Sequence, residues 1–236
     1  GGGMMNMMNG FLGDRMMVNG LPQPTRDVPA GWLRVRLLNG SNARIYKLAW
    51  SHDLPMTVIG GDGGLLERPA PRRVLTLAPA QRADVLVDLS RIAPGTDVHL
   101  ESLAFPESDA GRMGMMGGAS PVPNGAALRL MTLRTRRHEG APFTVPERLS
   151  TLGASWALAP GLPVRRVPLM FQRMQWLIAG RTFGMDEVAA DETVSAGSTH
   201  VWEFVNQGAG MGMGMGMRAA HPIHMHGRQF RVISRS

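Results

Sequence analysis

The segment 221–227 reads His-Pro-Ile-His-Met-His-Gly and brings three histidines together within six residues. Neutral imidazole is a favoured ligand for copper and zinc, so the segment is a candidate metal site. On a β-strand, side chains alternate between two faces, which would place His224 and His226 on one face and His221 on the other. The spacing therefore predicts two ligands for one metal centre and one for a neighbouring centre. The alternative is a histidine-rich edge strand that binds no metal.

Methionine is the second residue type with metal chemistry. The chain has 19 methionines and 30 glycines, often interleaved. A thioether is a soft ligand suited to Cu(I), so clusters of methionine are candidate Cu(I) sites. The alternative is a flexible, low-complexity segment in which methionine is tolerated. The candidate ligands are Met113, Met115, Met116, Met211, Met213, Met215 and Met217, and a further cluster comprises Met4, Met5, Met7 and Met8.

Other catalytic chemistries find little support in the sequence. The chain has no cysteine, which excludes disulfides, thiol catalysis and thiolate metal sites. His52 stands in a Ser-His-Asp string, but a catalytic triad is assembled in space and not from neighbours in sequence. The remaining histidines stand alone, and we expect them to be structural or exposed: His99, His138 and His200.

Composition limits the class of protein. With 44% hydrophobic and 18% charged residues, the chain is typical of a globular protein, and its 236 residues allow two packing units. No apolar run reaches the roughly 20 residues that span a membrane. The formal net charge is +7, but the arginines are scattered and form no stripe. We therefore expect no nucleic-acid partner, because such proteins gather their positive charge on one face.

The elements that position these residues are expected to be short strands. Residues 32–38 alternate polar and apolar side chains and end at Asn39-Gly40, which is a strong strand-and-turn signal. No amphipathic helix of ordinary length is evident, so we predict an all-β fold, a sandwich or Greek-key barrel. The other expected strands are 43–49, 56–59, 73–77, 83–89, 97–103, 127–133, 166–172, 175–178, 198–205 and 229–233.

The pattern also predicts how the chain is divided. Residues 1–10 form a Met/Gly-rich lead-in, and residues 11–137 form a complete β domain. Residues 138–162 are rich in proline and small residues and are interpreted as an interdomain linker. Residues 163–236 form a second β domain, which we expect to be incomplete.

The histidine segment and the following Arg228-Gln229-Phe230 resemble the third copper motif of multicopper oxidases, in the last cupredoxin domain of that family. Upstream blocks follow the family's order and resemble the middle domain of bacterial copper-efflux oxidases and laccases: residues 10–14, 18–20, 32–44, 62–66 and 81–87. The resemblance covers most of the chain and implies cupredoxin-like Greek-key β-sandwich domains.

Carried over residue by residue, the resemblance implies that His221 binds the type 1 copper, His224 the type 2 copper and His226 a type 3 copper. It implies four coppers in the intact parent enzyme and no catalytic residues beyond the copper ligands. In such oxidoreductases a reducing substrate gives up single electrons, and dioxygen is reduced to water.

The family also requires histidine and cysteine motifs that this sequence lacks, and a type 1 site depends on a cysteine thiolate. We therefore expect a fragment that needs the N- and C-terminal parts of the same oxidase and is inactive alone. The implied reductants are phenols, aromatic amines or Cu(I), and the methionines favour a role in copper homeostasis. Export to the periplasm is implied by the resemblance alone.

Two alternatives remain open at this point. The first is a non-catalytic module that sequesters copper with its histidine and methionine clusters. The second is a two-domain copper oxidase or nitrite reductase, against which the middle-domain blocks argue.

Overall fold

The protein is almost entirely β-structure. A computed structural model describes residues 10–106, 121–151, 159–173, 175–209, 220–227 and 229–235. In these ranges the helical elements are the 3₁₀ turns η1 (Ser51–Asp53) and η4 (Ala190–Glu192). The described part contains no helix long and apolar enough to cross a membrane. The all-β prediction is therefore confirmed.

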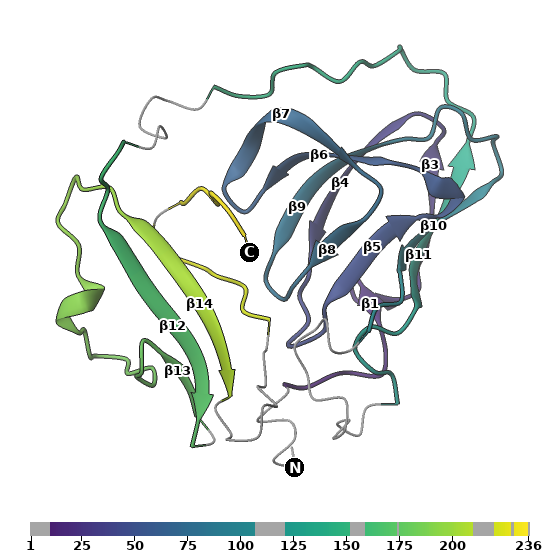
Figure 1. Ribbon diagram of the computed structural model, residues 1–236. Coiled ribbons are helices and arrows are strands. Elements are labelled where there is room, and N and C mark those ends of the chain that lie inside the picture. Colours follow the sequence, from purple (N-terminus) through teal and green to yellow (C-terminus); the bar gives the residue numbers. More distant parts are fainter. Residues whose placement is uncertain are drawn as a thin grey trace.

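Two sheets form a sandwich in the first part of the chain (Figure 1). One has the order β3-β11-β10-β5-β8 and the other β4-β9-β6-β7, and a short β1-β2 ribbon precedes them. The strands are β1 (Met17–Val18), β2 (Leu21–Pro22), β3 (Thr25–Pro29), β4 (Trp32–Leu38), β5 (Tyr46–Trp50), β6 (Met56–Gly61), β7 (Gly64–Arg72), β8 (Leu75–Leu77), β9 (Arg82–Asp88), β10 (Asp97–Ser102) and β11 (Leu128–Arg136).

Alternating side chains from both sheets build the core of this sandwich. On β9, Val85 and Val87 are fully buried, and on β10 Val98 and Leu100 face them in the same cluster. Period-two burial of this kind is what a strand packed on one face requires. The strand alternation expected from the sequence is therefore present in the first unit.

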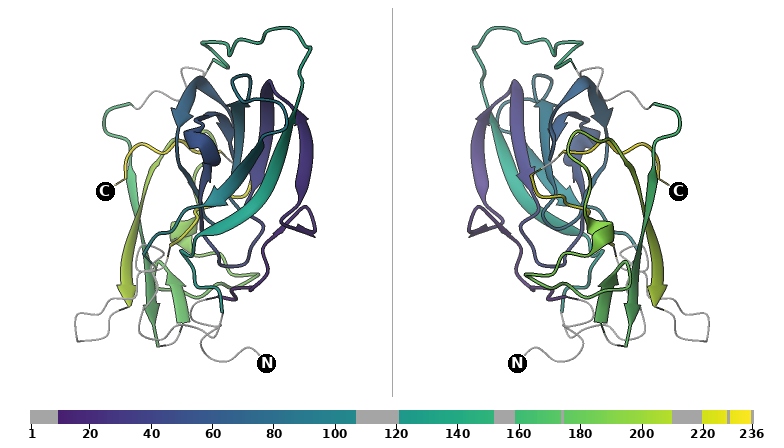
Figure 2. Two further views of the ribbon diagram at one scale, coloured as in Figure 1. Left: turned by 90° about the vertical axis from the view of Figure 1, so that its right-hand side faces the viewer. Right: turned by 90° about the vertical axis from the view of Figure 1, so that its left-hand side faces the viewer.

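A third sheet lies apart from this sandwich (Figures 1 and 2). It contains β13 (Gln175–Ile178), β12 (Val164–Gln172) and β14 (Val201–Ala209) in that order, with β12 antiparallel to β13 and parallel to β14. Its buried hydrophobic side chains in the described ranges are Val167, Leu169 and Phe171 on one face of β12. The residues from 137 to 151 lead from the first unit toward this sheet.

Several strands differ from the expectations. Strand β7 is not among the expected strands. It contains Pro69 and Pro71, which an edge strand that pairs only with β6 tolerates. Strand β3, also at an edge, was likewise missed. The strand expected at 229–233 is wrong: these residues have no strand assignment, and none of the described strands pairs with them.

Candidate metal centre

The histidine segment follows β14 in the chain and has an irregular backbone. Residues 220–225 carry no strand assignment, and a turn at His226 and Gly227 places Gly227 at a φ of +69°. The strand premise behind the alternation of the three histidines is therefore wrong for this segment. Their side chains must be placed from their contacts.

His221 is half-buried and packs against an aromatic ring of the third sheet. Its ring centroid lies 5.4 Å from that of Trp176 on β13, with the planes 77° apart. Its Nε2 atom is buried and has no hydrogen-bond partner among the described residues. Burial lowers the pKa of His221, because desolvation disfavours the imidazolium form. Burial thus favours the neutral imidazole of His221, and its Nε2 makes no hydrogen bond within the described part of the chain.

His224 and His226 lie beside each other. Their ring centroids are 4.8 Å apart with an interplanar angle of 82°, and both residues are exposed. In the described ranges no three His, Cys, Asp or Glu side chains converge as a metal site. The segment therefore offers one pair of adjacent imidazoles and, separately, the ring of His221.

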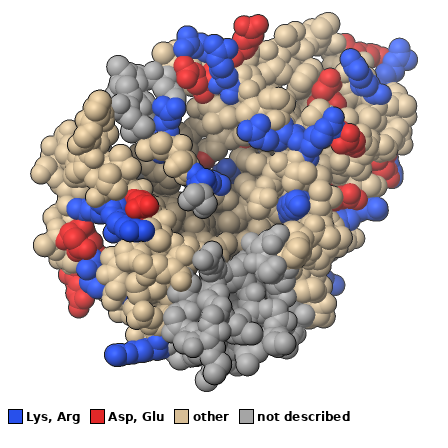
Figure 3. Space-filling model, in the orientation of Figure 1, with Lys and Arg blue, Asp and Glu red and all other residues tan. Residues whose placement is uncertain are grey.

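A cavity of about 830 Å³ lies against this segment. One wall consists of residues of β12, β13 and β14, another of residues 220–226, and the third of first-unit residues that include Asn42 and Asn124. The space-filling view shows the surface hollowed between the two parts of the molecule, with acidic and basic side chains interspersed around it (Figure 3). All three candidate histidines line this one cavity.

Several cavity residues were missed in the sequence. Trp176, which positions His221, lies in a short strand without any motif. Arg165 stands over the ring of Trp202 at 5.0 Å and donates to the Thr193 carbonyl at 3.0 Å. Arg181 donates to Asp191 at 2.9 Å. These residues come together only in the folded structure, so no sequence signal could have identified them.

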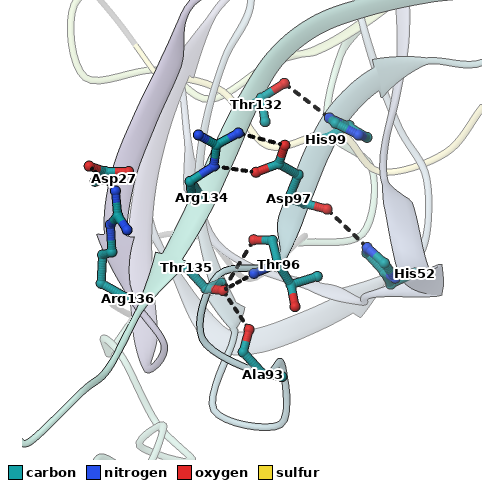
Figure 4. Close-up of polar contacts among 10 residues, drawn as sticks. All are labelled: Asp27, His52, Ala93, Thr96, Asp97, His99, Thr132, Arg134, Thr135 and Arg136. Atoms are coloured by element: carbon teal, nitrogen blue, oxygen red, sulfur yellow. Dashed lines mark hydrogen bonds and ion pairs between the residues drawn. The ribbon is translucent and has the colours of Figure 1, made fainter.

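The other histidines make structural contacts, as expected. His99 Nδ1 lies 3.0 Å from Thr132 Oγ1, and His52 Nε2 lies 3.0 Å from the Asp97 carbonyl oxygen (Figure 4). In the same group of contacts Arg134 donates to the Asp97 carboxylate at 2.8 and 3.0 Å. His200 lies 3.0 Å from Ser198 Oγ. None of them lines the cavity of the histidine segment.

The methionine clusters lie outside the described residues, namely Met4, Met5, Met7, Met8, Met113, Met115, Met116, Met211, Met213, Met215 and Met217. Met225, inside the histidine segment, lines the cavity.

The three histidines fit copper as part of a larger ligand set. Neutral imidazole is a common copper ligand, and the Nε2 of His221 has no hydrogen-bond partner among the described residues. The pair His224 and His226 can supply two further nitrogens. Because the sequence has no cysteine, the cysteine ligand of a type 1 site cannot come from these 236 residues.

Comparison with known proteins identifies a consistent group of relatives. The multicopper oxidase family pattern matches residues 159–236. A laccase from Bacillus stratosphericus is 32% identical over 95% of this chain and 40% of its own length. The cell division protein FtsP of Xenorhabdus nematophila is 51% identical over 83 residues, which are 35% of this chain and 18% of that protein.

Solved structures agree in fold. The laccase-like multicopper oxidase CueO from Ochrobactrum superposes with a TM-score of 0.67 at 28% identity, over 87% of this chain and 44% of that one. The multicopper oxidase McoA variant from Aquifex aeolicus gives 0.64 at 32% identity, over 74% and 36%. The cupredoxin-like fold is therefore confirmed. The chain spans less than half the length of these relatives.

Proposed function

Because the chain belongs to the multicopper oxidases by its sequence and its cupredoxin fold, we propose that it is part of a laccase-like oxidoreductase. The parent enzyme would couple one-electron oxidation of a reductant to the reduction of dioxygen to water. The observation that carries this proposal is the set of three imidazoles on one cavity, with His224 beside His226 and His221 set against Trp176.

The residues of this chain would hold copper and fix its surroundings. His221 would be the type 1 ligand, His224 the type 2 ligand and His226 a type 3 ligand. Bound copper would supply one-electron redox chemistry and the reduction of dioxygen. Trp176 packs edge-on against the His221 ring, and burial favours the neutral form of that ring, which has one ring nitrogen free to bind a metal.

The ligand set of this chain is partial, so we propose that the chain alone has no oxidase activity. A complete site needs ligands that the 236 residues do not contain, a cysteine among them. The domain division proposed from the sequence, with residues 11–137 as a middle domain and 163–236 in the last domain, fits this partial set. The other ligands would come from the remaining parts of the same oxidase.

The reductant is proposed by chemical class. Phenols and aromatic amines are one-electron donors that fit a laccase-like parent, and the methionine clusters favour Cu(I) as a second donor because thioethers are soft ligands. Cuprous oxidation would serve copper homeostasis in an exported, periplasmic protein.

Copper titration tests the proposal directly. The purified chain would be titrated with Cu(II) and followed by electron paramagnetic resonance, with total copper measured by metal analysis. We expect copper to bind with imidazole nitrogen coupling, and the double variant His224→Ala/His226→Ala to weaken binding by at least about tenfold through loss of both ligands. Oxygen consumption with a phenolic donor should be absent for the chain alone.

Matched controls are available within the chain. His52→Ala removes an exposed imidazole and His200→Ala a partly buried one, neither of which lines the cavity, so both should leave copper binding unchanged. Equal weakening by His52→Ala, or no copper binding by the unaltered chain, would contradict the assignment of the three ligands.

A second candidate function rests on the FtsP relatives. The identity of 51% over 83 residues with a cell division protein exceeds the 32% found with the laccase. A parent with a role in cell division, and without oxidase turnover, is the alternative. A parent protein that binds copper but consumes no oxygen with any donor would favour a non-catalytic module, whereas turnover would favour the oxidase.

A further inference from the structure

One guanidinium nitrogen on the wall of the cavity is buried without a hydrogen-bond partner. Arg165 is on β12 and lines the cavity, and its Nη1 atom makes no hydrogen bond to any of the described residues. Its Nη2 atom donates to the Thr193 carbonyl oxygen at 3.0 Å. A buried donor without an acceptor costs free energy, and the cost is larger for a charged group. An acceptor bound in the cavity would remove this cost.

The charge of Arg165 is also without an ion pair in the part of the chain that the structure describes. Its neighbour Arg166 pairs with Glu203 at 3.3 Å, and Arg181 pairs with Asp191 at 2.9 Å. The charge of Arg165 contributes to the lowered pKa of Asp191, but the main cause is the hydrogen bond from Arg181. The wall therefore offers one positive charge to an anionic group of a ligand.

Aromatic side chains surround this charge. Arg165 is the register partner of Trp202 on β14, and its Cζ atom lies 5.0 Å from the centroid of the Trp202 ring. Phe204 shares that face of β14, with its ring centroid 6.1 Å from that of Trp202. Trp176 on β13 lines the same cavity. The cavity volume of about 830 Å³ lies within the range of about 300–1,000 Å³ that is typical of small-molecule sites.

From these observations we propose that the cavity binds an aromatic carboxylate, with the carboxylate on Arg165 and the ring among the aromatic side chains. A guanidinium binds a carboxylate through charge-assisted hydrogen bonds, and aromatic rings pack favourably on one another. His221, the proposed type 1 ligand, lines the same cavity. Phenolic acids are therefore the class of reductant that this wall selects. This assignment of the reductant rests on the proposed oxidase function.

Binding of 4-hydroxybenzoate to the full chain, without copper, tests the site. Isothermal titration calorimetry would compare it with methyl 4-hydroxybenzoate, which has no carboxylate charge, and with acetate, which has no ring. We expect 4-hydroxybenzoate to bind at least about tenfold more tightly than either, because a hydrogen bond to a charged group and the burial of a ring each contribute that much. Higher salt concentration should weaken the binding of 4-hydroxybenzoate and not that of the ester.

The adjacent arginine provides the matched control. Arg165 and Arg166 both lie on β12 and line the cavity, but Arg166 is paired with Glu203. Arg165→Gln should weaken the binding of 4-hydroxybenzoate by about tenfold or more and leave that of the ester unchanged, whereas Arg166→Gln should change either by less than about threefold. Arg165→Lys retains the charge without the planar fork and should give an intermediate affinity.

The outcomes decide each part of the inference. Equal binding of the acid and the ester, or equal effects of Arg165→Gln and Arg166→Gln, would overturn the carboxylate site. Acetate that binds as tightly as 4-hydroxybenzoate would overturn the aromatic part and indicate a simple anion site. If circular dichroism shows that Arg165→Gln does not fold, the comparison of acid and ester on the unaltered chain still decides.

The test is independent of the proposed function because it uses no copper. A chain that binds no Cu(II) would contradict the proposed function and leave the carboxylate site standing. A chain that binds Cu(II) but does not distinguish the acid from its ester would contradict only the carboxylate site.

Discussion

Single residues with buried polar groups stabilise the loops of the first unit, and Arg44 is the largest of them. Its exposed fraction is 2%, and its guanidinium donates to the carbonyls of Gly13, Val122 and Pro123, each at 2.8 Å. Burial lowers the pKa of Arg44, since desolvation disfavours its charge. One side chain thereby joins a loop before β1 to the loop before β11.

Replacing Arg44 by methionine should destabilise the first unit. The three carbonyls would lose a charged donor, and such hydrogen bonds contribute more than neutral ones, so we expect a loss of about 3 kcal/mol in the free energy of unfolding. Urea denaturation followed by tryptophan fluorescence measures this loss. Arg36→Met, at a side chain that is 77% exposed, should stay within about 0.5 kcal/mol. Equal losses for both variants would contradict the role of Arg44.

Asp84 gives a prediction for pH dependence. Arg34 Nε donates to Asp84 Oδ1 at 2.9 Å, and this hydrogen bond is the main cause of the lowered pKa of Asp84. A carboxyl whose folded pKa is depressed contributes stability above its ordinary pKa of 3.8 and loses it as pH falls through the folded value. Asp84→Asn should therefore cost about 1 kcal/mol at neutral pH, with the difference closing below pH 3.8.

Urea titrations of both proteins at neutral and acidic pH test this dependence. A difference that stays constant across the range would show that the charge of Asp84 does not contribute. Glu139→Gln is a suitable control, because its side chain is 78% exposed and should have little effect at either pH.

At the same scale, the sequence predicts candidate metal ligands but not the residues that surround them. Three histidines close together can be recognised in the sequence, whereas the contact of His221 with Trp176 joins positions 45 residues apart and is seen only in the folded structure. The separate placement of the three rings was argued from strand alternation. The segment is not a strand, so its backbone does not impose that alternation.

At the scale of elements, alternation predicted strands well where one face is buried. Strand β4 with its Trp-Leu-Arg-Val-Arg-Leu-Leu pattern was expected at residues 32–38 and has those bounds. Strand β4 is an edge strand, as β3 and β7 are, but β3 and β7, which contain proline, were not among the expected strands. The strand expected at 229–233 is absent because none of the described strands pairs with it. A favourable sequence pattern does not form a strand without a pairing partner.

The tight packing around Gly60 in the β6–β7 hairpin can be tested by substitution. The pairing register of β6 shifts between Val58 and Gly60, and a Cβ atom on Gly60 would lie 2.9 Å from the Gly64 carbonyl oxygen. Because that oxygen belongs to the backbone, Gly60→Ala must displace the hairpin, and we expect a cost of about 2 kcal/mol in urea denaturation. Gly61→Ala meets its nearest atom at 3.7 Å and should cost less than about 1 kcal/mol. Equal costs would contradict the steric argument.

At the scale of the whole molecule, the buried core is unevenly distributed. The main hydrophobic cluster draws all of its buried members from residues 48–133, from Leu48 to Leu133. In the second unit, the buried hydrophobic residues of the described part are Val167, Leu169 and Phe171. Hydrophobic burial is the dominant stabilising contribution in folding, so the two units should differ in stability.

We therefore expect the second unit to open before the first. Amides of β12 and β14 should exchange at least about tenfold faster than those of β10 and β11. The free energy of local opening is smaller where fewer hydrophobic side chains are buried. Leu169→Ala should lower only the earlier transition in urea, and Val98→Ala only the later one, each by about 2–4 kcal/mol. Hydrogen exchange with mass spectrometry resolves both regions in one experiment. A single transition shifted equally by both variants would mean that the cavity walls couple the two units into one cooperative structure.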